Sequence, residues 1–340
     1  MKYLPALDGL RAVAILSVVA SHIVTSLVPG SFGVTLFFFI SGFIITRMLF
    51  SEHFESLLPF YVRRFFRLGP ALIFYVTCCV LAIYLVGREV VWPDVAAALL
   101  YYANYHDPHM SSMSTMWSLA VEEHFYLIYP PIFLLFRAEP LKLQRVLIGV
   151  LVCCLLWRFN MVRLGYPFEH ILRHTESRID SIAFGCLLAV LAHRNPDGLV
   201  KKFGDRRWLG VALILLASTM LVRDEAFRET LRYSLQGIAF FIVFCHLFYS
   251  SAESWLRDIL QSNWLVYIGK ISYSLYLYHE FGLIFGDSFG RNRWETMAIA
   301  LVITVPATLF SYYFIETPAR RWGAGLARNL AARQAIAKPN

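Results

Sequence analysis

The sequence predicts an all-α polytopic membrane protein with about ten transmembrane helices and both termini in the cytoplasm. Of its 340 residues, 58% are hydrophobic and only 16% are charged, and the mean hydropathy is +0.56. A soluble chain of this length would need more charged side chains to cover its core. The apolar residues also gather into runs, most of which approach the roughly 20 residues that a helix needs to cross a bilayer.

The apolar runs set the order of the predicted helices. They lie at 7–28, 31–50, 69–87, 91–105, 116–136, 145–161, 177–193, 207–222, 231–250, 265–286 and 295–315. The run at 91–105 is short and contains Pro93, Asp94 and Asn104. We therefore expect it to lie on the outer face or to dip into it, where irregular backbone is tolerated if protein or water covers it.

The distribution of Lys and Arg determines how the other ten runs cross, because cytoplasmic loops of membrane proteins carry an excess of both residues. The basic clusters lie at 63–67, 137–145, 194–207 and 320–338. With the N-terminus inside, all four clusters are inside provided that 91–105 does not cross. We expect one transmembrane domain over 1–322 and a basic cytoplasmic tail over 323–340, with Pro318 ending the last span.

Composition also limits the partners and cofactors. The net charge of +8 is accounted for by basic loops at a membrane, so we expect the lipid bilayer and no nucleic acid as a partner. All six cysteines lie inside apolar runs, where they behave as small hydrophobic residues. His106, His109 and the other loop histidines show no ligand spacing, and no HExxH or CxxC motif occurs. We therefore expect no metal ion.

The first apolar run contains two ionisable residues, Arg11 and His22. Such a group inside a membrane helix costs roughly 2.5–3.5 kcal/mol, so it is retained where it has a partner or a function. The two residues are 11 positions apart, close to three helical turns, which puts them on one face and roughly 16 Å apart along the axis. The spacing predicts a polar site that faces the interior of the bundle.

An arginine cluster lies in the segment FYVRRFFRLGP, residues 60–70. Arg64 and Arg67 are neighbours on a helix, Arg63 is beside them, and guanidinium groups bind phosphate through paired hydrogen bonds. The cluster could hold the phosphates of a nucleotide-based donor at the cytoplasmic face. The alternative is a basic collar attracted by anionic lipid, and the spacing alone favours the collar.

The segment TMWSLAVEEHFYLIYPP, residues 115–131, places Glu122 and Glu123 inside an apolar helix. Adjacent residues point about 100° apart, so at most one of these carboxylates can reach a given partner. A buried carboxylate either has a raised pKa or is paired with a cation, and both states suit acid–base catalysis. The alternative is a hydrogen bond that only packs two helices together.

Two further segments carry polar side chains into predicted spans. Arg178 and Asp180 open the run that begins near 177, where they either pair with other polar groups or cap a helix. The run at 265–286 contains several hydroxyl groups as well as Tyr276 and His279. Such a content suggests a polar cavity for a hydroxylated ligand, although tyrosines also form interfacial belts.

Taken in order, these segments resemble the acyltransferase-3 family of integral membrane O-acyltransferases, which modify surface polysaccharides, lipid-linked sugars and some natural products. The matching stretches are LDGLRAVAILSVVASH, GVTLFFFISGFIIT, the RFFR of 64–67, WSLAVEEHFYLIYP, SRIDSIAFG, GKISYSLYLYH and FIETP. The ordered set extends over almost the whole chain. The resemblance implies a ten-span protein of the bacterial cytoplasmic (inner) membrane. Many family members append an extracytoplasmic SGNH-hydrolase-like domain, which we expect this chain to lack.

The resemblance also implies an activity: transfer of an acetyl or related acyl group from cytoplasmic acyl-CoA, the co-substrate, to a hydroxyl of a surface glycan or lipid-linked sugar. It implies that His22 is the catalytic base or a transient acyl carrier, that Glu122 or Glu123 orients it, and that Arg11 stabilises an oxyanion or binds phosphate. The cluster of Arg63, Arg64 and Arg67 becomes the donor site, which reverses the preference from spacing. The expected substrate-binding residues are Trp117, Ser118, Tyr126, Arg178, Asp180, Tyr276 and His279.

The residues themselves leave other classes open. A transporter or flippase of a polar or acylated substrate explains Arg11, His22 and the tyrosine-rich run equally well. It explains the arginine cluster less well, makes no use of the ordered motifs, and is weakened because the sequence shows no internal repeat. A non-catalytic membrane scaffold leaves the buried charges without an explanation.

Overall fold

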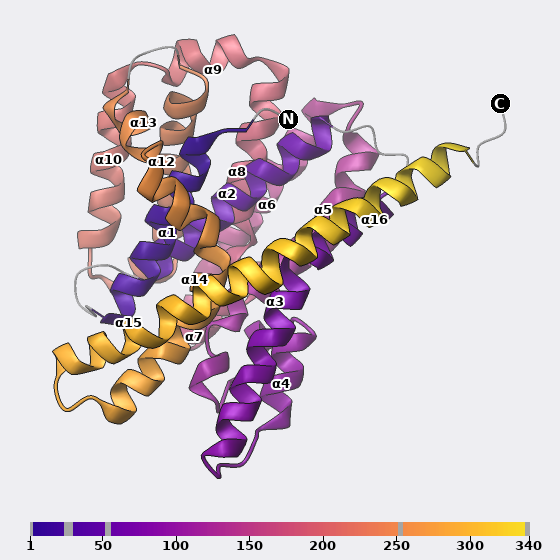
Figure 1. The fold of residues 1–340 in the computed structure, drawn as a ribbon. Helices are drawn as coiled ribbons and strands as arrows, with labels where there is room; N and C mark the ends of the chain where they lie inside the picture. Colours follow the sequence, from indigo (N-terminus) through magenta and orange to yellow (C-terminus); the bar gives the residue numbers. More distant parts are fainter. Residues whose placement is uncertain (1–2, 24–29, 52–55, 251–253, 337–340) are drawn as a thin grey trace. The chain divides into compact units, whose positions relative to one another are not determined.

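The computed structural model describes residues 3–23, 30–51, 56–250 and 254–336 (Figure 1). This part of the chain forms helices and short connections and contains no strand, which confirms the predicted all-α class. The α-helices are α1 (Pro5–Ile23), α2 (Gly30–Ser51), α3 (Leu58–Leu85), α4 (Trp92–Leu99), α5 (Met116–Phe136), α6 (Pro140–Arg163), α7 (Phe168–Arg173), α8 (Thr175–Arg194), α9 (Pro196–Phe203), α10 (Arg206–Leu221), α11 (Glu225–Glu229), α12 (Leu231–Phe248), α13 (Trp255–Leu260), α14 (Asn263–Phe289), α15 (Arg293–Phe310) and α16 (Thr317–Ile336). Two 3₁₀ turns, η1 (Ala103–Tyr105) and η2 (Ser111–Met113), and a π-helical segment, η3 (Ser311–Glu316), complete the described elements.

Six helical segments of the described chain are long and apolar enough to cross a membrane. They are Gly30–Ser51, Leu58–Leu85, Ser111–Phe136, Pro140–Arg163, Leu231–Phe248 and Arg293–Arg333. The helices α1, α8, α10 and α14 coincide with further predicted spans but are shorter or more polar. By contrast, α4 has only eight residues, about 12 Å of helix, far less than the roughly 30 Å hydrocarbon core. The run at 91–105 therefore does not form a crossing helix.

Several helix starts are fixed by side chains that cap the first turn. Asn195 accepts a hydrogen bond from the Gly198 N–H at the start of α9, and Asp224 accepts one from the Phe227 N–H at the start of α11. Asn292 accepts hydrogen bonds from two N–H groups of α15. Each cap satisfies N–H groups that have no partner inside the helix.

The chain divides into two compact units, each built from two stretches of sequence. Met1–Glu52 and Ser118–Lys270 form the first unit, and His53–Trp117 and Ile271–Asn340 form the second. In the first unit α2 contacts α1, α8 and α12. Its aromatic side chains pack into the core, with the rings of Phe39 and Phe244 4.6 Å apart and those of Phe43 and Phe244 5.4 Å apart. A helix that is apolar on all sides is buried on all sides.

Two glycines set how closely α2 and α8 approach in the first unit. A Cβ added to Gly42 would collide with the backbone oxygen of Ile182, and one added to Gly185 would collide with the backbone oxygen of Phe39. Small residues at such a crossing let two backbones touch, which is a common way to pack membrane helices. The close approach brings Arg178 and Asp180 of α8 into the core.

In the second unit α16 packs along α3, with the rings of Phe66 and Trp322 4.7 Å apart. The expectation that Pro318 ends the last helical span is wrong, because α16 runs on to Ile336 (Figure 1). Pro318 lies in the first turn of α16, where a missing N–H is tolerated. The π-helical turn of η3 directly precedes it. Residues 323–336 of the predicted tail are therefore helical.

Candidate functional site

Arg11 and His22 both lie on α1, as predicted, and the stripe between them faces α2. Ala14 and Val18 belong to the same stripe, and a Cβ on Gly33 of α2 would meet both of these residues. Arg11 is half-buried, and its guanidinium lies 3.9 Å from the carboxylate of Asp8 one turn earlier. His22 lies in the last turn of α1 and is exposed. The stripe is therefore closely packed in its middle and polar at both ends.

The predicted carboxylates lie on α5, and Glu122 contacts α2. Glu122 of α5 accepts a hydrogen bond of 2.7 Å from the Ser41 hydroxyl of α2, and the Tyr126 hydroxyl, one turn further, lies 3.4 Å from the Ser41 carbonyl oxygen. On the neighbouring face of α5, a nitrogen of His124 lies 2.8 Å from the Thr175 hydroxyl. Glu123, which lies between Glu122 and His124 in the sequence, is half-buried. Glu122 thus contacts α2, the helix that also contacts α1.

Asp180 forms a buried ion pair, the first of the two predicted alternatives, with a partner that the sequence did not identify. Its carboxylate lies 2.8 Å from the Arg158 guanidinium of α6, and both side chains are essentially without solvent exposure. Arg158 also donates to the backbone oxygens of Ser177 and Thr230 and to the Ser234 hydroxyl. Each of the three guanidinium nitrogens thus has a partner, as a buried charge requires.

Arg178, the companion of Asp180 in the sequence, contacts different groups. Its guanidinium donates to the Thr35 hydroxyl of α2 at 2.9 Å and lies 3.8 Å from the centre of the Tyr233 ring. An arginine over an aromatic face is attracted by the negative electrostatic potential that the ring quadrupole creates there. The two residues therefore join α8 to α2, α6 and α12 and are not helix caps.

Tyr276 and His279 lie on the part of α14 that belongs to the second unit. The Tyr276 hydroxyl donates to the Thr115 backbone oxygen at 2.9 Å, and Nδ1 of His279 lies 2.6 Å from the Tyr276 backbone oxygen. One position beyond His279, Glu280 accepts a 2.6 Å hydrogen bond from Ser114. These contacts hold the segment that leads to the buried side chains of Trp117 and Ser118 at the start of α5.

The arginine cluster forms part of α3 in the second unit. Arg63, Arg64 and Arg67 are half-buried in its first three turns. The ring of Phe66, within the same cluster, packs on Trp322 of α16. Near the start of α16, Glu316 accepts a hydrogen bond from Ser274 and lies 3.5 Å from the Arg320 guanidinium. Glu316 is thus occupied by α14 and α16 groups.

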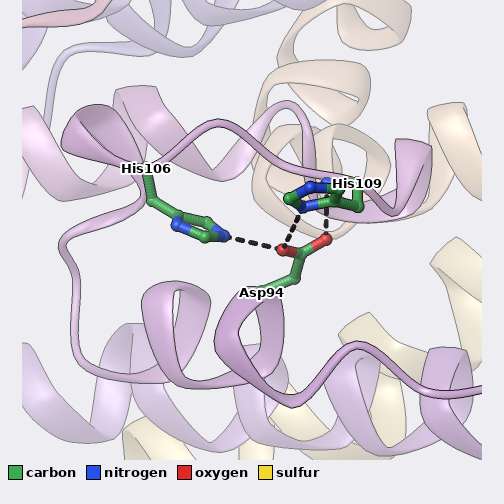
Figure 2. Close-up of side chains that lie close together, drawn as sticks. All are labelled: Asp94, His106 and His109. Carbon is green, nitrogen blue, oxygen red and sulfur yellow. Dashed lines mark hydrogen bonds and ion pairs between the residues drawn. The ribbon is translucent and has the colours of Figure 1, made fainter.

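A second group that the sequence analysis missed surrounds Asp94 in α4. Its Oδ1 lies 2.7 Å from Nε2 of His106 and 3.6 Å from Nδ1 of His109, and its Oδ2 accepts hydrogen bonds from the N–H groups of His109 and Met110 (Figure 2). Burial acts to raise the pKa of Asp94, but the hydrogen bonds from His106 and from the two N–H groups outweigh it and lower this pKa. The carboxylate is therefore ionised at neutral pH. The sequence feature that could have predicted this group is the pair of histidines in HDPH, residues 106–109, combined with Asp94 earlier in the chain.

The predicted site residues divide between the two units. The first unit contains Arg11, His22, Ser118, Glu122, Glu123, Tyr126, Arg178 and Asp180. The second unit contains Arg63, Arg64, Arg67, Trp117, Tyr276 and His279. Within the first unit, Glu122 and Tyr126 share Ser41 as a partner. Within the second, Tyr276 and His279 are joined through one backbone carbonyl.

The fold and its polar residues define an integral membrane protein: apolar helices long enough to cross a bilayer, with arginine, carboxylate and imidazole groups in and between them. The chain belongs to the Acyl_transf_3 family, described as an acyltransferase domain, which matches residues 4–316. It is 30% identical over 357 residues to O-acetyltransferase OatA from Staphylococcus aureus strains NCTC 8325 / PS 47, COL and MRSA252. These alignments cover 95% of this chain and 58% of each relative, so the chain matches little more than half of their length. No solved structure matches it.

Proposed function

We propose that this protein is a membrane O-acetyltransferase that moves an acetyl or related acyl group from acyl-CoA to a hydroxyl of a surface glycan or lipid-linked sugar. The observation that carries the proposal is the match of residues 4–316 to an acyltransferase domain. The relatives named O-acetyltransferase align along 95% of the chain, which supports oxygen as the accepting atom.

In the proposed mechanism, His22 takes the proton from the acceptor hydroxyl while the oxygen attacks the carbonyl carbon of the thioester. The new C–O bond replaces the C–S bond, and the CoA sulfur leaves as a thiolate that is then protonated. The Glu122 carboxylate is fixed by Ser41 of α2, which lies 11 residues, roughly 16 Å of helix, from the Gly30 that adjoins Ser21 next to His22. The proposal therefore assigns Glu122 to the Arg11 end of the stripe. Arg11 lies at the other end of the same stripe, roughly 16 Å along α1 from His22, so of its two expected roles the proposal takes the binding of donor phosphate.

We further propose ten spans in a bacterial cytoplasmic membrane, with both termini and the arginine cluster in the cytoplasm. The short α4 and the basic loops support this count. The proposal also places the segment 51–68 in the cytoplasm, and residues 52–55 of that segment lie outside the described residues. In a cysteine-free background, a thiol at exposed Asp107 should label from outside intact cells, whereas one at Lys142 should label only after permeabilisation. The reverse pattern would overturn the topology.

The direct test of the proposed activity uses purified protein, radiolabelled acetyl-CoA and a crude glycan or lipid-linked sugar acceptor. We expect free CoA thiol to appear together with acceptor-bound label. Uptake of labelled substrate by vesicles without thiol release would instead support a transporter. A mass difference between the surface glycans of cells with and without this gene would then identify the acceptor.

Replacing both Arg64 and Arg67 by Ala is expected to raise the KM for acetyl-CoA by roughly 10-fold or more per arginine. A hydrogen bond to a charged group contributes about 1.5–3 kcal/mol, and each guanidinium is proposed to hold a phosphate. The acceptor KM should change little. Steady-state kinetics with each substrate varied in turn measures both values.

The matched control replaces Arg328 and Arg333 by Ala, because these exposed arginines of α16 carry the same charge. If the cluster only attracts anionic lipid, the two double variants should behave alike and the donor KM should not change. That outcome would return Arg64 and Arg67 to the lipid-collar interpretation.

A further inference from the structure

Three side chains of the second unit converge on one point beside the loop between α4 and α5. One ligand atom each from Asp94, His106 and His109 lies within 4.8 Å of the other two, and both imidazole rings are turned toward the Asp94 carboxylate (Figure 2). The Asp94 side chain is fully buried, that of His106 is 22% exposed and that of His109 is 72% exposed. The cluster therefore has a buried carboxylate on one side and an imidazole that is open to solvent on the other.

We propose that Asp94, His106 and His109 bind a divalent transition-metal ion, with Zn²⁺ as the best-fitting representative. Two imidazole nitrogens and one carboxylate oxygen form a donor set that suits Zn²⁺ and related ions, whereas Mg²⁺ and Ca²⁺ prefer oxygen ligands alone. Three protein ligands leave a fourth position for water. Solvent reaches that position past the exposed ring of His109.

The existing distances are close to those of a bound site. With metal–ligand bonds of about 2.0–2.2 Å, ligand atoms around a tetrahedral ion lie roughly 3.4 Å apart. Binding would widen the 2.7 Å contact between Asp94 and His106 and shorten the 3.6 Å contact between Asp94 and His109. Both histidines lie in the loop between η1 and η2. Rotation of their side chains can supply both changes in distance.

The surroundings of Asp94 also fit a metal ligand. Its Oδ2 is held by the N–H groups of His109 and Met110 at 2.8 and 2.6 Å, while Oδ1 faces the histidines. Hydrogen bonds of this kind fix the orientation of a ligating carboxylate. Pro108 lies between the two histidines and limits the backbone freedom that binding would otherwise have to restrict.

A metal ion at this point would stabilise a loop that already contacts two helices of the second unit. Beyond His109, the backbone oxygen of Ser112 accepts from Tyr75 of α3. The backbone oxygen of Thr115 accepts from Tyr276 of α14, and Ser114 donates to Glu280 of the same helix. The ion would join His106 and His109, at the start of this loop, to Asp94 of α4. The contacts with α14 already hold the end of the loop, next to α5.

The test is a Zn²⁺ titration of the full-length protein in detergent, without a histidine tag, after removal of metals by a chelator and alkylation of exposed thiols. Competition with a chromogenic chelator should show one Zn²⁺ per chain. His109→Ala is expected to weaken this binding at least 100-fold, since losing even a group that only supports a ligand costs 10–100-fold. His109 is exposed, so the variant should fold. His106→Ala should have the same effect.

His170→Ala is the matched control, because His170 is also a partly exposed histidine whose ring stacks on that of a second histidine, His174. It should bind Zn²⁺ like the wild type, and its melting temperature should rise with Zn²⁺ as that of the wild type does. The melting temperature of His109→Ala should not respond. The proposal is overturned if the wild type binds no Zn²⁺, or if both histidine variants of the cluster bind it as the wild type does.

Discussion

His22→Gln is expected to lower acyl transfer by about 10²–10⁴-fold, the contribution of a general base, while the protein inserts and folds as before. Glutamine keeps a similar size and hydrogen-bonding capacity but cannot take a proton. His22 is exposed in the last turn of α1, so its replacement leaves no cavity in the core. Thiol release from acetyl-CoA, measured at saturating concentrations of both substrates, reports the loss in kcat.

The matched control is His193→Gln, which makes the same chemical change in the last turn of α8. His193 is exposed and stacks on the Phe50 ring, and the variant should retain near-wild-type transfer. Donor binding by His22→Gln should also persist, because the proposed phosphate contacts are made by arginines. If a correctly inserted His22→Gln protein transferred acetyl at the normal rate, the catalytic role would move to Glu122 or Glu123.

Two apolar runs predicted the ends of their helices closely. The run at 31–50 became α2 (Gly30–Ser51) and the run at 116–136 became α5 (Met116–Phe136). Hydropathy fails where a helix continues into charged sequence. The run at 69–87 belongs to α3, which already begins at Leu58, because arginine is a good helix former even though it is not apolar. The helix after Pro318 is a similar case, because α16 contains several arginines and is therefore not an apolar run.

The polar contacts show a sharper limit. Local spacing predicted that Glu122 and Glu123 would point apart, and Glu122 is in contact with Ser41 of α2. Spacing could not identify Ser41 itself, nor Arg158 as the partner of Asp180, because these contacts join residues that are distant in the sequence. A single sequence contains no information about which faces of two helices meet. The same limit hid the convergence of two loop histidines on Asp94.

Asp180→Asn is expected to destabilise the first unit by about 3–5 kcal/mol, the cost of leaving one member of a buried ion pair without its partner. The Asp180 carboxylate and the Arg158 guanidinium are 2.8 Å apart and almost fully buried. An amide at this position would leave a cation in the core with only dipolar partners. Thermal and denaturant-induced unfolding in detergent, followed by tryptophan fluorescence, measures the change.

Lys142→Ala provides the matched control, because the pair of Lys142 and Glu139 is 2.7 Å apart but more than half exposed, and such surface pairs contribute about 0–1 kcal/mol. The double variant Arg158→Met/Asp180→Leu should recover much of the lost stability, since apolar replacements of a whole buried pair are often neutral. If Asp180→Asn unfolds like the wild type but no longer transfers acetyl groups, Asp180 acts on the substrate and the ion pair is not what holds α6 against α8. If it is unstable and the double variant is both stable and active, the role of Asp180 is structural, and the predicted substrate contact must be sought elsewhere in the first unit.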